Sequence, residues 1–387
     1  MSYILLFVVV LVGAIIIHEA GHFVTARMFG MKAERFFVGF GPTLWSTQRG
    51  ETEVGLKAIP AGGFVKIAGM NRHDPVDPSD EDRAFYNQPA WQRAIVLVAG
   101  SFTHFVVAMA LLFVAMAFFA VPRLDGGEPV VNTTVGAVEP GSAAEEGGLR
   151  EGDIVLTIDG NDARDPRDAV DLIAERPGET FDVAVERAGE AEEVTVALPP
   201  TDPDGEERGF MGIGVSAVPY EQRSAGEALV ATVSGEYSVW SQTALTVRGL
   251  GQAFSPESLS AWLQQADGDT PRGVEGPISL VGAGQVVGAL GELGELGAVV
   301  LLMANINIVL GLLNMLPLPP LDGGHLAQLG IERGVNGIRA VRGKSTDWEL
   351  SPSVVTPVAL AVLMLLLGFA ATAFYIDIVN PASSLFQ

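Results

Sequence analysis

Two histidines and a glutamate stand close together in the first apolar stretch of the chain, in the order His18, Glu19 and His22. On a helix, residues four positions apart share a face, so His18 and His22 can hold one metal ion through their imidazole rings. Glu19 projects beside that face, where a carboxylate can take a proton from water that the metal activates. This H-E-x-x-H spacing is typical of zinc hydrolases and predicts a catalytic metal site.

The residues around this triplet are apolar. A charged side chain inside a bilayer costs at least ~2.5–3.5 kcal/mol, so three ionisable groups in one membrane helix require a shared role. A bound metal ion supplies that role. The alternative is a group of polar side chains that satisfy one another at a helix interface.

A third metal ligand is expected, because catalytic zinc keeps three protein ligands and one open position. The candidate is Asp322, at the end of the segment Asn-Met-Leu-Pro-Leu-Pro-Pro-Leu-Asp at 314–322. Its prolines interrupt a helix, and broken backbone at membrane depth is tolerated only where it lines a protein cavity. Asp322 is therefore well placed to meet the histidine pair. The alternative is an aspartate that caps the end of a span.

Four apolar stretches are long enough to cross a bilayer, which takes about 20 residues. We expect transmembrane helices at 1–30, 94–121, 296–325 and 350–378. The first stretch has no basic flank and no small-residue cleavage site, so we expect a retained helix rather than a signal peptide. The chain is therefore predicted to be an α-helical polytopic membrane protein.

Basic residues are distributed unevenly between the segments that join these helices. Residues 27–93 carry nine Lys and Arg, whereas 122–295 carry ten against 32 acidic residues. Because basic loops stay in the cytoplasm, we expect 31–93 and the loop at 326–349 on that side. Both termini and 122–295 are then expected outside the inner (plasma) membrane, which the chain crosses four times.

The composition excludes several classes of protein. The net charge of −23 opposes the phosphate contacts of nucleic-acid binding. The chain has no cysteine, which excludes disulfides, thiolate metal sites and cysteine nucleophiles. The acidic excess of the outer region is typical of a solvated surface, with repulsion of acidic partners or tolerance of high salt as the functional alternatives.

The motifs H-E-x-x-H and N-x-x-P-x-P-x-L-D-G lie on the first and third of the four spans. Together they resemble the site-2 protease family of intramembrane zinc metalloproteases, in particular its bacterial RseP-like branch. The segments 39–42 and 59–66 resemble the cytoplasmic-side β-hairpin with which that family dips into the membrane, and 276–279 also resembles the family.

The resemblance assigns roles to five residues and to a cofactor. It implies Zn²⁺ held by His18, His22 and Asp322, with Glu19 as the general base. It also implies that Asn314 orients the substrate backbone or stabilises the tetrahedral oxyanion, for which an amide N–H donor is suited.

Two further polar residues leave alternatives open. Asn307 lies seven residues before Asn314 on roughly the same helical face, where it either lines the cleft or makes an interhelical hydrogen bond. Many members of the family carry Gly-x-x-x-Asn where this chain has Gly100-Ser101-Phe102-Thr103-His104. We expect His104 either to polarise the scissile carbonyl or to make a helix–helix contact. We assign no role to His73.

The hairpin region has its own predicted role. Its segment at 61–68 is rich in β-forming residues, and two glycines allow close approach of another backbone. We expect Gly62, Gly63, Phe64 and Val65 to bind the unwound substrate by strand addition, because a helix must open before its peptide bonds can be reached.

The outer region begins with short strands separated by turns. We expect strands at 131–138, 154–158, 181–185 and 194–198 and a helix at 168–175. That order resembles an α+β PDZ-like domain, at 128–200, of the kind that adds a peptide to a sheet edge. Residues 201–295 are expected to form a linker and interfacial amphipathic helices at 226–254 and 258–265, with Trp240 and Trp262 as anchors.

These predictions combine into an intramembrane zinc metalloendopeptidase that cuts the transmembrane segment of single-pass membrane proteins. The resemblance suggests an anti-sigma factor as such a substrate. The other expected partners are a peptide tail at the PDZ groove and the lipid bilayer, and no nucleic acid. The first alternative is a non-catalytic membrane PDZ adaptor with a structural zinc site, against which Glu19 argues. A transporter is a weaker alternative, because the chain has no repeated pair of broken helices.

Overall fold

The computed structural model describes residues 2–70, 75–125, 128–130, 132–216, 220–268, 270, 272–273 and 276–386, so that His73 and Val131 lie outside the described residues. The chain forms two compact units. The helical unit comprises Met1–Ala117 and Ala225–Gln387, and the β-sheet unit comprises Phe118–Ser224.

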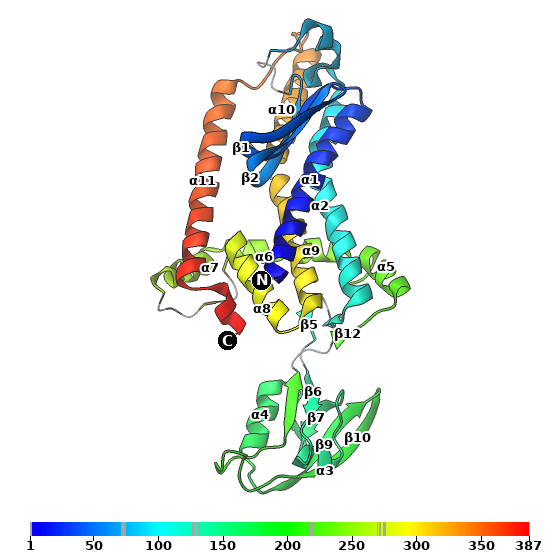
Figure 1. Ribbon diagram of the computed structural model, residues 1–387, viewed down its shortest axis with the longest axis vertical. Helices are drawn as coiled ribbons and strands as arrows, with labels where there is room; N and C mark the ends of the chain where they lie inside the picture. The colour runs from blue at the N-terminus through cyan, green and yellow to red at the C-terminus, as the bar shows by residue number, and fades with distance from the viewer. Residues whose placement is uncertain are drawn as a thin grey trace. The chain divides into compact units, whose positions relative to one another are not determined.

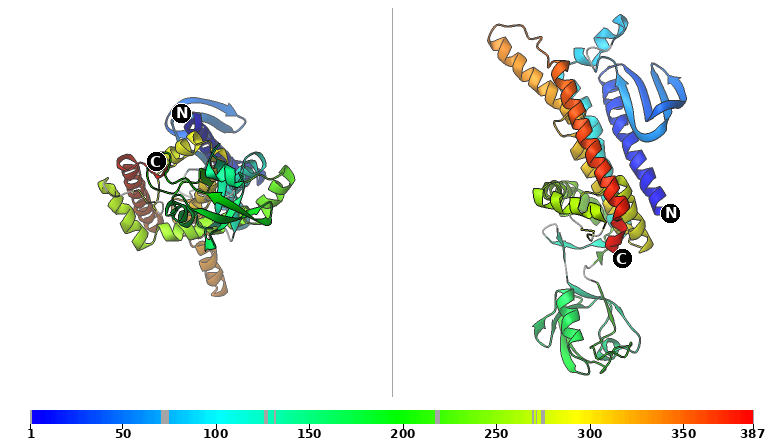
Figure 2. Two further views of the ribbon diagram at one scale, coloured as in Figure 1. Left: turned by 90° about the horizontal axis from the view of Figure 1, so that it is seen from below. Right: turned by 90° about the vertical axis from the view of Figure 1, so that its left-hand side faces the viewer.

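Four helices of the described chain are long and apolar enough to cross a membrane. They are α1 (Ser2–Met28), α2 (Ala90–Phe118), α9 (Leu296–Asn314) and α11 (Pro352–Val379). Each satisfies its backbone hydrogen bonds internally, as a segment in lipid must. Helices α1, α2 and α9 run side by side, whereas most of α11 stands apart from them (Figures 1 and 2).

Between α1 and α2 the chain forms a bent antiparallel hairpin of β1 (Ala33–Arg49) and β2 (Thr52–Ile67) beside α1 (Figure 1). The first half of β1 lies between two parts of β2, because Phe36 pairs with both Val65 and Val54. The last residues of β2 therefore form an edge strand, which is paired on one side only within the described hairpin.

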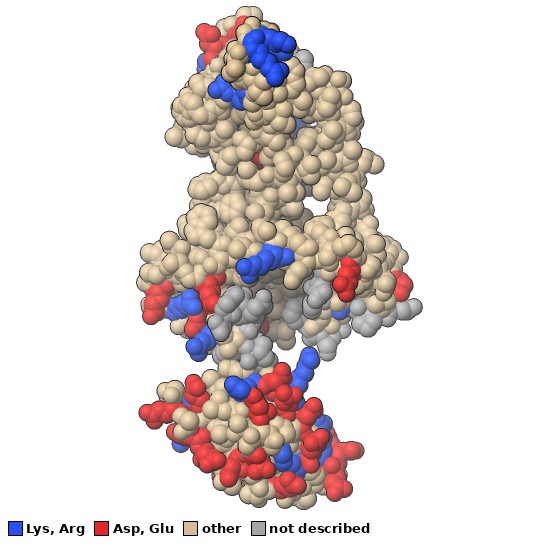
Figure 3. Space-filling view, turned by 180° about the vertical axis from the view of Figure 1, so that it is seen from behind, with Lys and Arg blue, Asp and Glu red and all other residues tan. Residues whose placement is uncertain are grey.

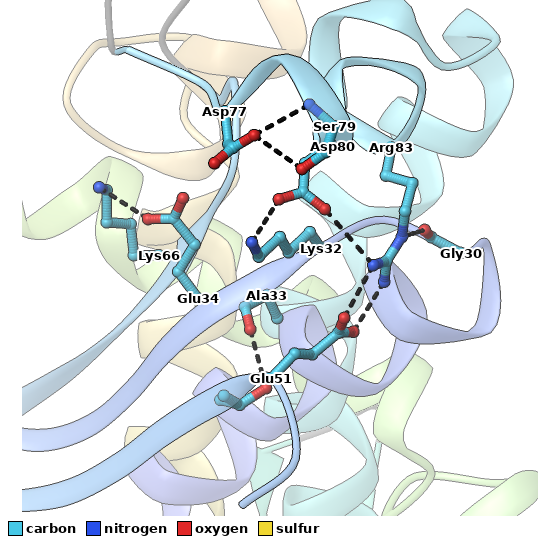
Figure 4. A network of polar contacts seen from close by, with 11 residues as sticks. Gly30, Lys32, Ala33, Glu34, Glu51, Lys66, Asp77, Ser79, Asp80 and Arg83 are labelled. Atoms are coloured by element: carbon cyan, nitrogen blue, oxygen red, sulfur yellow. Dashed lines mark hydrogen bonds and ion pairs between the residues drawn. The ribbon is translucent and has the colours of Figure 1, made fainter. Parts of the chain in front are cut away.

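A polar network anchors the turn of this hairpin (Figure 4). Arg83 donates two hydrogen bonds of 2.7 Å to the Glu51 carboxylate, and its Nε donates to the carbonyl of Gly30 at 3.0 Å. Lys32 also pairs with Asp80. These contacts join the end of α1, the hairpin turn and the segment before α2. The bonds from Arg83 hold the pKa of the Glu51 carboxyl below its ordinary value.

The predicted third span is divided into two helices. Helix α9 ends at Asn314, as the prolines after it predict, and α10 (Asp322–Val341) begins after the non-helical segment 315–321. The expected loop at 326–349 was wrong over most of its length, since α10 continues to Val341. No proline interrupts that stretch, and Leu329 is buried against the C-terminal end of α1 and the N-terminal half of α2.

Shorter helices follow the β-sheet unit along the chain. They are α5 (Ala225–Val233), α6 (Val239–Ala253), α7 (Pro256–Gln264) and α8 (Leu280–Glu292). The described chain also has 3-10 helices: η1 (Pro78–Arg83) and η2 (Phe85–Asn87) lie before α2, and η3 (Gln265–Asp267) and η4 (Ala382–Phe386) lie after α7. Trp240 is exposed, as an interfacial anchor would be. The same prediction for Trp262 was wrong, because its ring is buried against Phe369 of α11.

The C-terminal end of α11 is held by a buried ion pair. Asp377 accepts a hydrogen bond of 2.8 Å from Arg272 and one of 2.7 Å from the backbone N–H of Ser279, and both charged side chains are at most 1% exposed. Gln285 of α8 donates to the Asp377 carbonyl at 3.1 Å. This cluster attaches α11 to the segment that leads into α8.

The β-sheet unit contains a sheet in the order β10-β9-β7-β6-β11, with β8 paired to β7. Its strands are β6 (Thr133–Val138), β7 (Ile154–Ile158), β8 (Asn161–Asp162), β9 (Thr180–Arg187), β10 (Glu190–Ala197) and β11 (Ile213–Ser216), with helices α3 (Ala143–Gly147) and α4 (Pro166–Ala174). Two short ladders pair β3 (Val121–Pro122) with β12 (Tyr220–Glu221) and β4 (Leu124–Asp125) with β5 (Glu128–Pro129).

This unit has an apolar core and an acidic surface. Val155, Ile158, Val183 and Val185 are among its fully buried side chains. Acidic side chains crowd the face of this unit that Figure 3 shows. The expectation that residues 201–225 form a linker was wrong in part, because β11 completes the edge of the sheet beside β6. The strand has only four residues, one of them Gly214, which conceals it in the sequence.

Candidate metal centre

The three predicted ligands meet at one point of the helical unit. Nε2 of His18 and Nε2 of His22 lie 3.2 Å apart, and each lies 3.4 Å from Oδ2 of Asp322. The two histidines come from consecutive turns of α1 and the aspartate from the first residue of α10. No other group of three His, Asp or Glu residues in the described chain is placed to hold a metal ion.

The spacing of these atoms fits a metal ion. A tetrahedral site with bonds of about 2.0–2.1 Å separates its ligand atoms by about 3.3–3.4 Å, which matches all three distances. Two imidazoles and a carboxylate are also a usual donor set for catalytic zinc. The residues therefore fit the predicted group in both chemistry and geometry.

The orientation of His22 is set by the backbone of α2. Its Nδ1 lies 2.7 Å from the carbonyl oxygen of Val96. A carbonyl can only accept, so we assign the proton of the neutral ring to Nδ1, which leaves a lone pair on Nε2 toward His18 and Asp322. Metal-binding histidines commonly have such an outer acceptor, which holds the ring in place.

Helix α2 approaches the histidines closely at Gly100. A Cβ atom at this position would lie 2.2 Å from Nε2 of His22 and 2.8 Å from Cε1 of His18. Any side chain there would displace the ligands. The next residue, Ser101, donates a hydrogen bond of 3.3 Å to Oδ2 of Asp322. Sequence reasoning missed both residues as parts of the site, although both lie in the segment compared with Gly-x-x-x-Asn.

The break after α9 delivers Asp322 to this point. A Cβ atom on Gly323 would lie 2.2 Å from the carbonyl oxygen of Met315, so the first turn of α10 packs directly on the broken segment. The glycine after the aspartate is thus required by close backbone approach. Asp322 begins a helix, but its side chain points to the histidines and does not cap the helix.

Glu19 lies between the ligands and the hairpin. It is half-buried, and a Cβ atom on Gly63 would lie 2.8 Å from its Cγ. The backbone of Val65 hydrogen-bonds its carboxylate. The structure therefore brings Glu19, Gly63 and the edge strand of β2 together beside the histidines. Gly62 and Phe64 adjoin them in the same strand.

The remaining predicted residues lie at different distances from the ligands. His104 and Asn307 are buried and form an interhelical hydrogen bond of 3.2 Å between α2 and α9. The His104 ring also lies 5.0 Å from the ring of His18, measured between centroids. Asn314 is the last residue of α9 and is half-buried, and the structure shows no hydrogen bond from its side chain to the described residues.

Comparison with known proteins identifies the family. The model of peptidase family M50 matches residues 6–351. This chain belongs to peptidase family M50. The M50 chain is 34% identical over 407 residues to zinc metalloprotease Rip1 of Mycobacterium tuberculosis, covering 98% of this chain and 97% of that protein. It is 30% identical over 372 residues to the chloroplastic membrane metalloprotease ARASP of Arabidopsis thaliana, covering 92% and 75%.

These findings confirm the predicted enzyme class: the M50 chain is a metalloprotease with apolar helices of membrane-spanning length. The name of Rip1 includes zinc, in agreement with the predicted cofactor. Among solved structures, the chain is also similar to the PDZ domain of an SdrC-like protein from Listeria monocytogenes. The identity is 22%, the match covers 24% of this chain and 92% of that domain, and the TM-score is 0.20.

Proposed function

We propose that this protein is an intramembrane zinc endopeptidase that hydrolyses a peptide bond within or beside the transmembrane helix of a single-pass membrane protein. The observation that carries the proposal is the triangle of His18, His22 and Asp322 atoms, 3.2–3.4 Å apart, with Glu19 beside it among apolar helices. A structural zinc site would need a fourth protein ligand and no adjacent base.

The chemistry follows from the residues around this point. Zinc, when bound by His18, His22 and Asp322, would polarise the substrate carbonyl and lower the pKa of water, so that the water can lose a proton and attack that carbonyl near neutral pH. Glu19 takes the proton of the attacking water and later delivers it to the leaving amine. Val96 keeps His22 in the required tautomer through its carbonyl. Asn314 orients the substrate backbone from the end of α9.

The hairpin presents the substrate to these groups. The edge strand of β2 is open on one side and runs past Glu19 at Gly63 and Val65. We propose that an unwound substrate segment adds to this edge, which places its backbone beside the metal ligands. Proline at Val65 or Ile67 removes a backbone donor from this strand, so such variants should lose cleavage while they keep their metal. Ile67→Pro is the cleaner test, because the backbone of Val65 also hydrogen-bonds Glu19.

The orientation proposed for the chain decides on which side of the membrane a product fragment is released. With the hairpin on the cytoplasmic side of the inner membrane and the β-sheet unit outside, cleavage releases a cytoplasmic fragment. From the resemblance to the site-2 protease family, we propose as substrate a membrane-bound anti-sigma factor whose outer domain has already been removed. Among the described strands β11 lies at the edge of the sheet, which supports a peptide tail as a further ligand of the β-sheet unit.

The test is cleavage of a tagged single-pass substrate of this type by wild type and by the Glu19→Gln variant, with zinc measured on both. We expect wild type to cut and the variant to retain zinc while cleavage falls about 10²–10⁴-fold. Cleavage by Glu19→Gln at the wild-type rate would disprove the base assignment. Zinc binding without cleavage of any of a panel of single-pass substrates would favour the adaptor alternative.

A further inference from the structure

Ser101 is a buried polar residue that the proposed mechanism does not use. It is 1% exposed and lies in the apolar helix α2. Its hydroxyl donates to Oδ2 of Asp322 at 3.3 Å, and that same oxygen lies 3.4 Å from Nε2 of both histidines. Three groups therefore converge on one carboxylate oxygen, two from α1 and one from α2.

The direction of this hydroxyl is unusual within the molecule. Hydroxyl groups inside helices commonly bond to a carbonyl three or four residues earlier in the same helix. Thr25, Thr103, Thr246 and Thr372 all do so here, at distances of 2.7–2.9 Å. Ser101 instead bonds across to another helix, to a residue 221 positions later in the chain.

A donor at this place has a specific physical effect. The terminal torsion of an aspartate is broad, so either oxygen can turn toward the histidines unless something holds the group. A hydroxyl bond to Oδ2 selects one orientation and stabilises its negative charge, while a second lone pair of that oxygen stays free for the metal. Outer partners of this kind tune metal ligands in other proteins.

We propose that Ser101 is a positioning residue that orients Asp322 for metal binding, an inference that rests on the proposed metal site. The hydroxyl acts through the aspartate and does not contact the substrate. Gly100 and Ser101 then have complementary roles: one makes room for the histidines and the other holds the carboxylate opposite them.

The experiment measures the zinc Kd of the full-length protein by competition with a chelator, and the visible spectrum of the Co²⁺-loaded protein. Ser101→Ala should raise the Kd about 10–100-fold and alter the spectrum, and Ser101→Thr, which restores the hydroxyl, should recover most of the affinity. Thr103→Val is the matched control, because it removes a hydroxyl of the same helix whose bond, among the described residues, is to the carbonyl of Gly100 in that helix. It should leave both readouts unchanged.

A double-mutant cycle with Asp322→Asn shows whether Ser101 acts through the aspartate. We expect the effect of Ser101→Ala to disappear in the Asp322→Asn background. An unchanged Kd in Ser101→Ala, or an equal effect in both backgrounds, would overturn the proposal. If Asp322→Asn itself binds zinc as wild type does, the metal site is wrongly assigned. If only Asp322→Asn weakens binding, the metal site stands and the role of Ser101 falls.

Discussion

The helical unit places two carboxylates, the buried Asp377 and the half-buried Asp322, in very different surroundings. Asp377 of α11 is paired with the guanidinium of Arg272 and accepts a backbone N–H, so its charge is compensated by the chain itself. Asp322 of α10 faces two imidazoles and one hydroxyl. No Lys or Arg among the described residues pairs with it.

The difference separates a structural carboxylate from a ligand. A buried charge is tolerated when a partner compensates it. For Asp377 the partner is part of the chain, and the result is a fixed attachment of α11. For Asp322 we propose that the compensating charge is a metal cation, held also by the two neighbouring imidazoles. Each of the following predictions changes one side of this comparison.

The largest effect is expected on zinc binding. Asp322→Asn removes a charged ligand and should raise the zinc Kd by more than the about 10–100-fold that the loss of an outer partner costs, so that chelator dialysis strips the metal. Asp377→Asn should leave the zinc content of folded protein unchanged. Metal analysis of both purified variants after chelator dialysis checks this, and equal zinc loss in both would remove the distinction.

For the free energy of unfolding, the larger effect is expected from Asp377→Asn rather than from Asp322→Asn. Asp377→Asn leaves the Arg272 charge buried without its partner, which should destabilise the protein by about 3–5 kcal/mol. Replacing the pair together, with Arg272→Met and Asp377→Leu, should recover most of that loss. Unfolding in detergent micelles measures both variants. A single variant as stable as wild type would show that the pair is not essential to the attachment of α11.

A smaller effect is expected where α2 meets the ligands. Gly100→Ala places a Cβ atom 2.2 Å from Nε2 of His22, and overpacking of this kind typically costs about 1–3 kcal/mol. We expect weaker zinc binding from the displaced ring. Gly368→Ala in α11, where a Cβ atom meets nothing within 4 Å, is the matched control and should bind zinc normally. Equal zinc affinity in the two variants would refute the close approach.

The smallest effect is expected at the exposed pair of Glu51 and Arg83. The pKa of Glu51 is lowered in the folded state, so the pair stabilises the hairpin fully at pH values above 4.5, the ordinary pKa of a glutamate. That contribution is lost as the pH falls through the lowered folded value. Both side chains are about one-third exposed, so it should stay below about 1 kcal/mol. Hydrogen exchange of hairpin amides, corrected for intrinsic rates, should rise at low pH in wild type and show no such step in Glu51→Gln.

The two sides of the comparison also differ in what the sequence could predict. His18, Glu19 and His22 were accessible because helical periodicity places them together, and Asp322 because the prolines before it signal broken backbone in a span. Ser101 and the carbonyl of Val96 were not accessible, since their role depends on how α2 packs against α1 and α10. The pairing of Arg272 with Asp377 spans 105 positions and has no local signal.

The errors have a similar physical origin. Trp262 was assigned to the interface because its helix is amphipathic, but tertiary packing against Phe369 buries it. Strand β11 is short and gains its hydrogen bonds only from β6. In each case the decisive contact comes from a residue distant in the chain. Local patterns therefore predicted which three residues come together better than they predicted the surroundings that orient them.

X-ray absorption at the zinc edge of the purified wild-type protein tests the central claim most directly. The account predicts one zinc per chain with two imidazoles and oxygen ligands at about 2.0–2.2 Å. Zinc without imidazole scattering, or protein that binds no zinc at neutral pH, would contradict it.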